Sequence, residues 1–184
     1  MTHDFDNDFN FSTSAVADAL VRRACHRLVP GCCGVTRATP AEDRRGTDYW
    51  VRTASGRIGL DLKLRRKDYG AARGASIDCV IELDGRGSSG WLMKPRAAPL
   101  ILFACIDTSR VAMFETKMLQ TVVMQNLSRW IANGSAKEFT TESQHRDGRT
   151  WTNYAVIISG DLLASVIDRL EDGYGGAAND GDEQ

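Results

Sequence analysis

The chain has 184 residues, of which 42% are hydrophobic and 26% charged, and its formal net charge is −1. This length and composition predict one soluble globular domain with a substantial core. No apolar run reaches about 18 residues and the N-terminus is acidic, so we expect no transmembrane helix, no signal peptide, no membrane partner and a cytoplasmic protein. Five cysteines, in no spacing typical of zinc ligands, favour free thiols in a reducing compartment.

The charge is unevenly distributed along the chain. Residues 1–13 and 171–184 contain eight acids and no Lys or Arg, whereas residues 14–170 contain 23 basic against 16 acidic side chains, a balance of +7. A basic body suits a nucleic-acid partner, because Lys and Arg neutralise phosphate. A solvated surface with acidic ends explains the same balance equally well.

We expect residues 1–11 to form a mobile N-terminal arm, followed by a single domain over residues 12–170. The first predicted helix begins at the capping residues 12–14 and ends before Pro30, because its apolar residues recur every three or four positions. Asp18 lies on this helix one turn before Arg22. Two alternatives remain open for Asp18: a surface ion pair with Arg22, or a role as a further acid of a functional site.

Residues 31–45 contain glycines, a proline and arginines, and predict a loop with one short strand near Val35. Arg44 and Arg45 lie at its end, shortly before the most informative stretch of the chain. They are candidate contacts to nucleic acid.

Two consecutive strands are predicted between residues 46 and 65. In the second strand leucines and one isoleucine occupy alternate positions from residue 58 to residue 64, so Asp61 and Lys63 share the opposite face. The turn-forming residues 54–56 precede it, and the resulting hairpin would bring Asp48 alongside Asp61. Side chains two residues apart on a strand lie roughly 7 Å apart, near enough to serve one phosphate or one metal ion.

An acid, a turn and then acid-x-Lys on consecutive strands resembles the PD-(D/E)XK superfamily, also called restriction-endonuclease-like. Asp48, Asp61 and Lys63 match its motif, and Thr47 stands where the loosely kept proline would be. The likeness extends in outline over residues 12–133. More locally, D-L-K-L-R-R-K-D-Y-G followed by I-E-L resembles a group of phage- and plasmid-borne members. The resemblance implies an α/β fold with a restriction-endonuclease-like core, in which helices flank a mixed central sheet.

The resemblance also implies the roles of individual residues. Asp48 and Asp61 would hold Mg²⁺ or Mn²⁺, and the backbone carbonyl of Leu62 would add a ligand. Lys63 would orient or deprotonate the attacking water. Hard oxygen ligands suit Mg²⁺, which stabilises the charge that develops on a phosphoryl group.

Further candidates follow the hairpin. A basic group could support a phosphodiester backbone at the end of the proposed catalytic strand; it consists of Arg65, Arg66, Lys67 and Arg73. Residues 77–84 alternate between apolar and polar and predict a third strand. If this strand pairs beside the Asp61 strand, Glu82 becomes a further metal-binding and catalytic acid; otherwise it is a charge that protects an edge strand.

The remaining elements are predicted from their apolar patterns. They are a central strand at residues 100–106, a short strand at 111–114, a helix at 116–133, a strand at 151–158 and a final helix that ends at Leu170. Residues 134–150 are polar and predict an exposed excursion, with His145 as its candidate base. Residues 171–184 predict a disordered acidic tail.

These patterns favour a Mg²⁺-dependent endonuclease or phosphodiesterase that acts on nucleic acid, with DNA as a better candidate substrate than RNA. We expect the protein to come from a phage or mobile element. The patterns are also compatible with a homodimer. The alternative is a non-catalytic module with the same fold that binds nucleic acid or a host-defence protein. The Asp61 and Lys63 pair is then only an exposed ion pair. A Ser or Cys hydrolase is disfavoured, because the sequence has no nucleophile-elbow motif.

Overall fold

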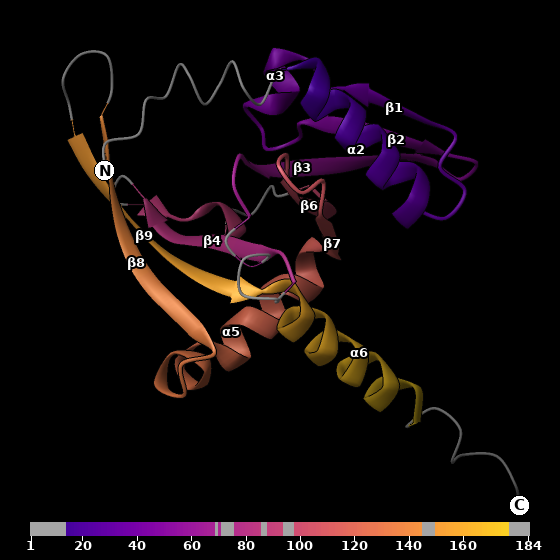
Figure 1. Cartoon of the computed structure of the whole chain (residues 1–184). Helices are drawn as coiled ribbons and strands as arrows, with labels where there is room; N and C mark the ends of the chain where they lie inside the picture. The colour runs from indigo at the N-terminus through magenta and orange to yellow at the C-terminus, as the bar shows by residue number, and fades with distance from the viewer. Residues whose placement is uncertain are drawn as a thin grey trace, which may run out of the picture.

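The computed structural model describes residues 14–68, 70, 76–85, 88–93, 98–144 and 150–176. Over these residues the chain is an α/β protein with a mixed five-stranded sheet, a smaller antiparallel sheet and four α-helices (Figure 1). The larger sheet has the strand order β1-β2-β3-β6-β7, and the smaller one has the order β5-β4-β9-β8. No helix in the described part of the chain is long and apolar enough to cross a membrane.

The larger sheet contains the predicted hairpin and the predicted central strand. Its strands are β1 (Gly34–Arg37), β2 (Tyr49–Thr53), β3 (Gly56–Arg65), β6 (Leu100–Cys105) and β7 (Val111–Glu115). β2 and β3 are antiparallel and joined by a tight turn, with Thr53 opposite Gly56. β6 runs parallel to β3, as a buried strand reached through a long connection can, and pairs with β7 on its other side.

Helix α2 (Ala15–Leu28) covers one face of this sheet (Figure 1). The Ser14 side chain caps it by accepting a hydrogen bond from the Ala17 N–H at 3.3 Å. Leu20 and Val21 pack against Leu60 of β3 in one buried cluster. Each such side chain contributes about 1.5–3 kcal/mol by leaving water. The predicted first helix is therefore confirmed.

The second layer covers the opposite face of β3 and β6. It contains β4 (Asp78–Gly85), β5 (Ser88–Ser89), β8 (Ala136–Gln144), β9 (Thr150–Ser159), the 3₁₀ turn η1 (Trp91–Met93), α5 (Thr116–Ala132) and α6 (Gly160–Gly176). Ile101 and Phe103 of β6 join Ile81, Leu119 and Ile158 of this layer in the larger buried cluster. β3 and β6 consequently lie between two layers, and Asp61 on their second face is buried.

The strand pairing decides two expectations about the second layer. The strand predicted at residues 77–84 is present as β4, but it pairs with β5 and β9 and not with β3, so the condition for Glu82 to become a further metal-binding acid is not met. The alternation of residues 77–84 shows which face is buried but does not specify the neighbouring strand. The expected excursion at residues 134–150 is instead largely the edge strand β8, which pairs with β9. Its exposed charged residues, such as Lys137 and Glu138, conceal the strand pattern.

The described helices differ from the expected ones in two further places. A short helix, α3 (Pro40–Asp43), interrupts the expected loop, and Thr39 and Glu42 form a capping box at its start. Helix α6 continues to Gly176, past the expected end at Leu170. The expected N-terminal arm and residues 177–184 lie outside the described residues.

Candidate functional site

Asp48 and Asp61 meet where β2 begins. Tyr49 pairs with Leu60, so the antiparallel register places Asp48 opposite Asp61 on the neighbouring strand. The backbone of Asp48 is held on both sides, because its C=O accepts the Ala38 N–H at 2.9 Å and its N–H donates to the Leu60 C=O at 2.9 Å. The pairing of two acids predicted from the hairpin is therefore present.

The two carboxyl groups interact directly. The side chain of Asp48 hydrogen-bonds that of Asp61, and one Asp48 oxygen accepts the Leu62 N–H at 2.6 Å. Burial and the neighbouring charge of Asp61 raise the pKa of Asp48 to about 7, although the Leu62 N–H and the Lys63 charge oppose this shift. Near neutral pH the Asp48 carboxyl is therefore protonated for part of the time.

Lys63 completes this arrangement. Its Nζ lies 2.8 Å from Oδ2 of Asp61, whose side chain is only 10% exposed. The same Nζ lies 4.5 Å from the ring centroid of Trp91, a distance typical of a cation–π contact. Trp91 packs in turn against Phe103, with 6.0 Å between ring centroids. The ammonium group is thus fixed between a carboxylate and an aromatic face.

Trp91 is the residue of this site that the sequence did not reveal. It lies in η1, which belongs to the second layer and packs against β4 and α5. Trp91 and Lys63 are far apart in the sequence, so no local sequence pattern links them. Only the stacking of the layers brings them together.

The polar face of β3 continues to Arg65. Because side chains alternate, Asp61, Lys63 and Arg65 point to the second layer, as do Phe103 and Cys105 of β6. Nη1 of Arg65 is buried and has no hydrogen-bond partner among the residues that the structure describes. A buried guanidinium nitrogen without an acceptor is costly, and a phosphate oxygen would satisfy it.

Asp18 is placed elsewhere. Its Oδ1 accepts hydrogen bonds from the Tyr49 hydroxyl and from Nη2 of Arg37, each at 2.6 Å. Burial raises the pKa of Asp18, but these two hydrogen bonds and the charge of Arg37 outweigh it and hold the pKa below its usual value. Tyr49 packs toward α2, on the face opposite Asp48, so the structure does not bring Asp18 to the acid pair. Its ion-pair partner is Arg37 and not the expected Arg22.

The candidate ligand set is small. Among the described residues, no three His, Cys, Asp or Glu side chains gather closely enough to hold a metal ion. Glu82 therefore does not join the pair, in line with its position in the other sheet. Leu62 directs its N–H toward Asp48, and since the N–H and C=O of one strand residue point to the same side, its carbonyl is also turned away from β6. Two carboxylates and one carbonyl are the available oxygens.

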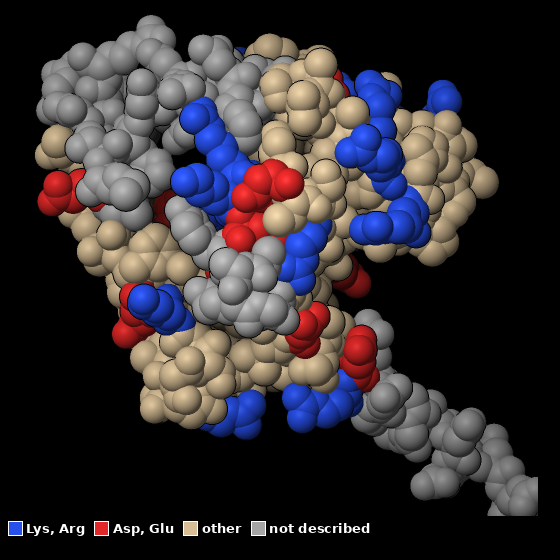
Figure 2. All heavy atoms as spheres, viewed as in Figure 1, with Lys and Arg blue, Asp and Glu red and all other residues tan. Residues whose placement is uncertain are grey.

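Basic residues flank the site in sequence. Arg44 ends α3, and it and Arg45 are exposed shortly before Asp48. Arg66 and Lys67 are exposed directly after β3. Figure 2 shows acidic side chains bordered by basic ones near the place where β3, β4 and β6 meet, and a second basic group over α2. The predicted residues Arg73 and His145 lie outside the described residues.

Comparison of the chain with protein-family models, with curated proteins and with solved structures gives no match.

Proposed function

We propose that this chain is a metal-dependent nuclease that hydrolyses phosphodiester bonds of nucleic acid, with DNA as the first candidate substrate. The observation that carries the proposal is the pairing of Asp48 with Asp61 across β2 and β3, together with the ion pair between Asp61 and Lys63. An acid pair with a fixed ammonium group is unusual in an element that serves stability alone, because bringing two carboxylates together costs free energy. Perturbed pKa values of this kind concentrate at functional sites.

We further propose that the larger sheet and α2 form a restriction-endonuclease-like core. The order of elements supports this: a helix, three antiparallel strands and then a buried strand parallel to the third. The acids also occupy the matching places, with Asp48 at the start of β2 and Asp61 two residues before Lys63 on β3. The long connection between β3 and β6 contains a second sheet's strands, which the resemblance did not predict.

The donor set fits Mg²⁺ or Mn²⁺. The carboxylates of Asp48 and Asp61 and the carbonyl of Leu62 are hard oxygen ligands, and the remaining positions suit water or phosphate. Burial and, after it, the charge of Asp61 raise the pKa of Asp48, and a bound cation would offset both effects by neutralising the carboxylates. A bound divalent cation would neutralise phosphoryl charge and acidify a bound water.

Lys63 has a defined part in this proposal. Its ammonium group, held by Asp61 and Trp91, provides a preorganised positive charge beside the reacting phosphoryl group. In hydrolysis a water oxygen attacks phosphorus, the bond to the leaving oxygen breaks, and that oxygen takes up a proton. Lys63 orients the water and stabilises the negative charge, while the exposed Arg66 and Lys67 hold the substrate backbone.

A second candidate function is a non-catalytic module that binds nucleic acid or a host-defence protein. One observation favours it: Lys63 is already engaged by Asp61, and only two acids contribute to the pair. In that case the ion pair serves stability, and metal ions have no effect on binding. The cleavage assay described next separates the two functions.

The test is incubation of the purified protein with circular, linear and branched DNA and with RNA, in Mg²⁺, in Mn²⁺ and in a chelator. We expect cleavage of at least one substrate with metal and none with the chelator. Asp61→Asn should abolish it, whereas Asp43→Asn, which changes an exposed acid of α3, should not. Absence of cleavage under every condition, with nucleic-acid binding retained, would establish the second function in place of the first.

A further inference from the structure

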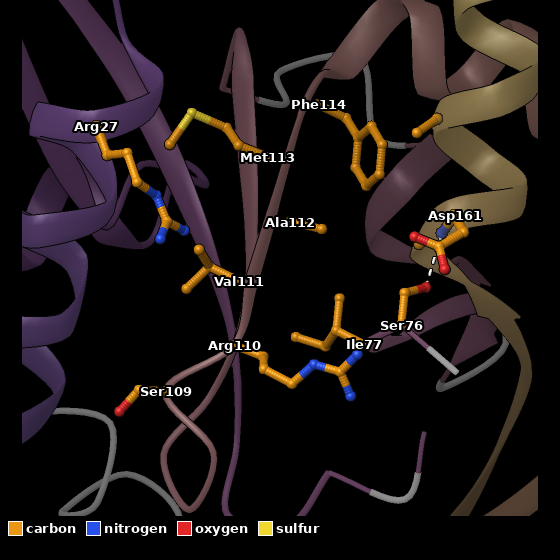
Figure 3. A pocket seen from close by; sticks show the side chains of 12 residues that line it. Arg27, Ser76, Ile77, Ser109, Arg110, Val111, Ala112, Met113, Phe114 and Asp161 are labelled. Atoms are coloured by element: carbon orange, nitrogen blue, oxygen red, sulfur yellow. Dashed lines mark hydrogen bonds between the residues drawn. The ribbon is translucent and has the colours of Figure 1, made fainter. Parts of the chain in front are cut away.

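A groove of about 440 Å³ runs along the edge of β7 with which no other described strand pairs, and it is remote in sequence from the acid pair (Figure 3). β7 is the last strand of the larger sheet, and the groove is lined by every residue from Ser109 to Phe114. Successive residues of a strand point to opposite faces of the sheet. A groove that touches all of them therefore follows the strand edge and not one face.

The backbone of this edge is directed into the groove. The Arg110 C=O accepts the Cys105 N–H at 3.0 Å, which makes this pair a hydrogen-bonded pair of the antiparallel ladder. Every second residue of β7 then bonds to β6, and the residues between them turn their N–H and C=O outward. Val111, Met113 and Glu115 are those residues. The groove thus offers the spaced donors and acceptors that a further strand requires.

The two walls differ in chemistry. Val111 and Met113 point toward α2, where the exposed Arg27 lines the groove (Figure 3). Phe114 points to the opposite side, where α6 begins. On that side lies the exposed side chain of Asp161, whose backbone N–H donates to Oγ of Ser76 at 2.7 Å.

We infer that this groove binds an extended peptide segment of a partner protein, which adds to the sheet as a strand beside β7. Its backbone pairs with Val111 and Met113. Alternate side chains that face α2 are apolar or acidic, to match Arg27, and those that face α6 are basic or hydroxyl-bearing, to match Asp161. The inference is independent of the proposed nuclease activity, because β6 lies between β7 and β3, the strand that carries Asp61, and neither acid of the pair lines the groove.

A second copy of the chain fits this edge less well. Antiparallel pairing of β7 with itself requires a two-fold axis perpendicular to the continuous sheet. Such an axis leaves α2 of both copies on the same side, so two Arg27 side chains of like charge would face the same side of the continuous sheet. A partner peptide is free to place an acid there.

The test uses the full chain and a fluorescein-labelled peptide, Glu-Thr-Val-Lys-Glu-Thr-Val-Lys, whose two sets of alternate residues match the two walls. Binding is followed by fluorescence anisotropy, and amide hydrogen exchange reports the N–H groups of Val111 and Met113. We expect saturable binding and slower exchange at these positions. Met113→Pro removes an N–H that points outward and makes no hydrogen bond to β6. This change should weaken peptide binding at least about tenfold. Met113→Ala keeps the N–H and should bind within about threefold of the wild type.

Further probes complete the test. Arg27→Glu should weaken binding of this peptide and favour a version with Lys in place of Glu. A peptide that is N-methylated at alternate amides should not bind. Equal binding of the Glu-containing peptide to the wild type and to Met113→Pro would overturn the inference. It would also be overturned if neither the Glu-containing peptide nor its version with Lys bound to the protein. A doubled mass in light scattering that Met113→Pro abolishes would also overturn it and assign the edge to a second copy.

Discussion

The backbone N–H of Leu62 donates a hydrogen bond of 2.6 Å to the carboxylate of Asp48. Leu62 stands between Asp61 and Lys63. Residues 61–63 therefore supply two charged side chains of the site and also the backbone N–H that binds the third, Asp48. The position of Asp48 is therefore set by this backbone N–H together with the side chain of Asp61, which also hydrogen-bonds it. Substitutions that change the charges of the site one at a time test this arrangement.

The acid pair should make the metal-free protein less stable as the pH rises. The pKa of Asp48 is about 7 in the folded chain, well above the usual value of 3.8, so between these values the folded state binds more protons than the unfolded state and stability falls with rising pH. Asp48→Asn keeps an acceptor for the Leu62 N–H and removes the charge. We expect it to stabilise the protein above neutral pH by on the order of 1–2 kcal/mol.

Chemical denaturation across the pH range measures this effect. Near pH 4, where Asp48 is protonated in the folded state, the variant and the wild type should differ little. Asp43→Asn serves as the control, because Asp43 is exposed on α3. A variant that is less stable than the wild type at high pH would show that the pair does not repel.

Asp18 should have the opposite pH dependence. Its pKa is lowered in the folded state, so its contribution to stability is complete at neutral pH and is lost as the pH falls through the folded pKa. Asp18→Asn retains the hydrogen-bond geometry with Tyr49 and Arg37 but loses the charge. Its side chain is 33% exposed, so we expect a loss of less than about 1 kcal/mol at neutral pH.

Thermal unfolding at neutral and acidic pH measures the Asp18 effect, and cleavage is the second readout. Because Asp18 lies on the α2 face of the sheet, any cleavage activity should remain within about twofold of the wild type, while Tm decreases slightly. Loss of activity with unchanged stability would place Asp18 in the site after all.

Binding of nucleic acid should depend strongly on salt. Lys67 is exposed directly after β3, at the end of the proposed catalytic strand. If it contacts phosphate, Lys67→Ala should reduce the slope of log affinity against log salt concentration by about one. Lys137→Ala, on the exposed side of β8, should leave the slope unchanged. Identical slopes for all three proteins would remove Lys67 from the interface.

The sequence predicted the hairpin that places Asp48 opposite Asp61 better than it predicted the sheets around that hairpin. The alternation of apolar residues on β3 and the turn before it were sufficient to place Asp48 opposite Asp61, because hairpin geometry is local. The same kind of alternation on β4 did not reveal that Glu82 belongs to another sheet. Pairing between distant strands depends on the whole packing arrangement, and no short pattern encodes it.

Contacts between the layers were also beyond reach from sequence. Trp91 lies against Lys63 only because η1 packs onto the second face of β3. The free edge of β7 and its groove likewise depend on where α2 and α6 lie. Local patterns show which residues are buried, but neighbours across layers require the complete fold.

The most direct test of the central claim is the measurement of Mn²⁺ affinity and nucleic-acid cleavage on the same preparations of wild type, Lys63→Met and Asp61→Asn. Lys63 competes with a metal ion for Asp61, so Lys63→Met should bind Mn²⁺ at least as tightly as the wild type and yet lose cleavage by at least about a hundredfold. Asp61→Asn should lose both. Mn²⁺ binding that is unaffected by Asp61→Asn, or cleavage that is unaffected by either change, would contradict the assignment of this acid pair as the metal site of a nuclease.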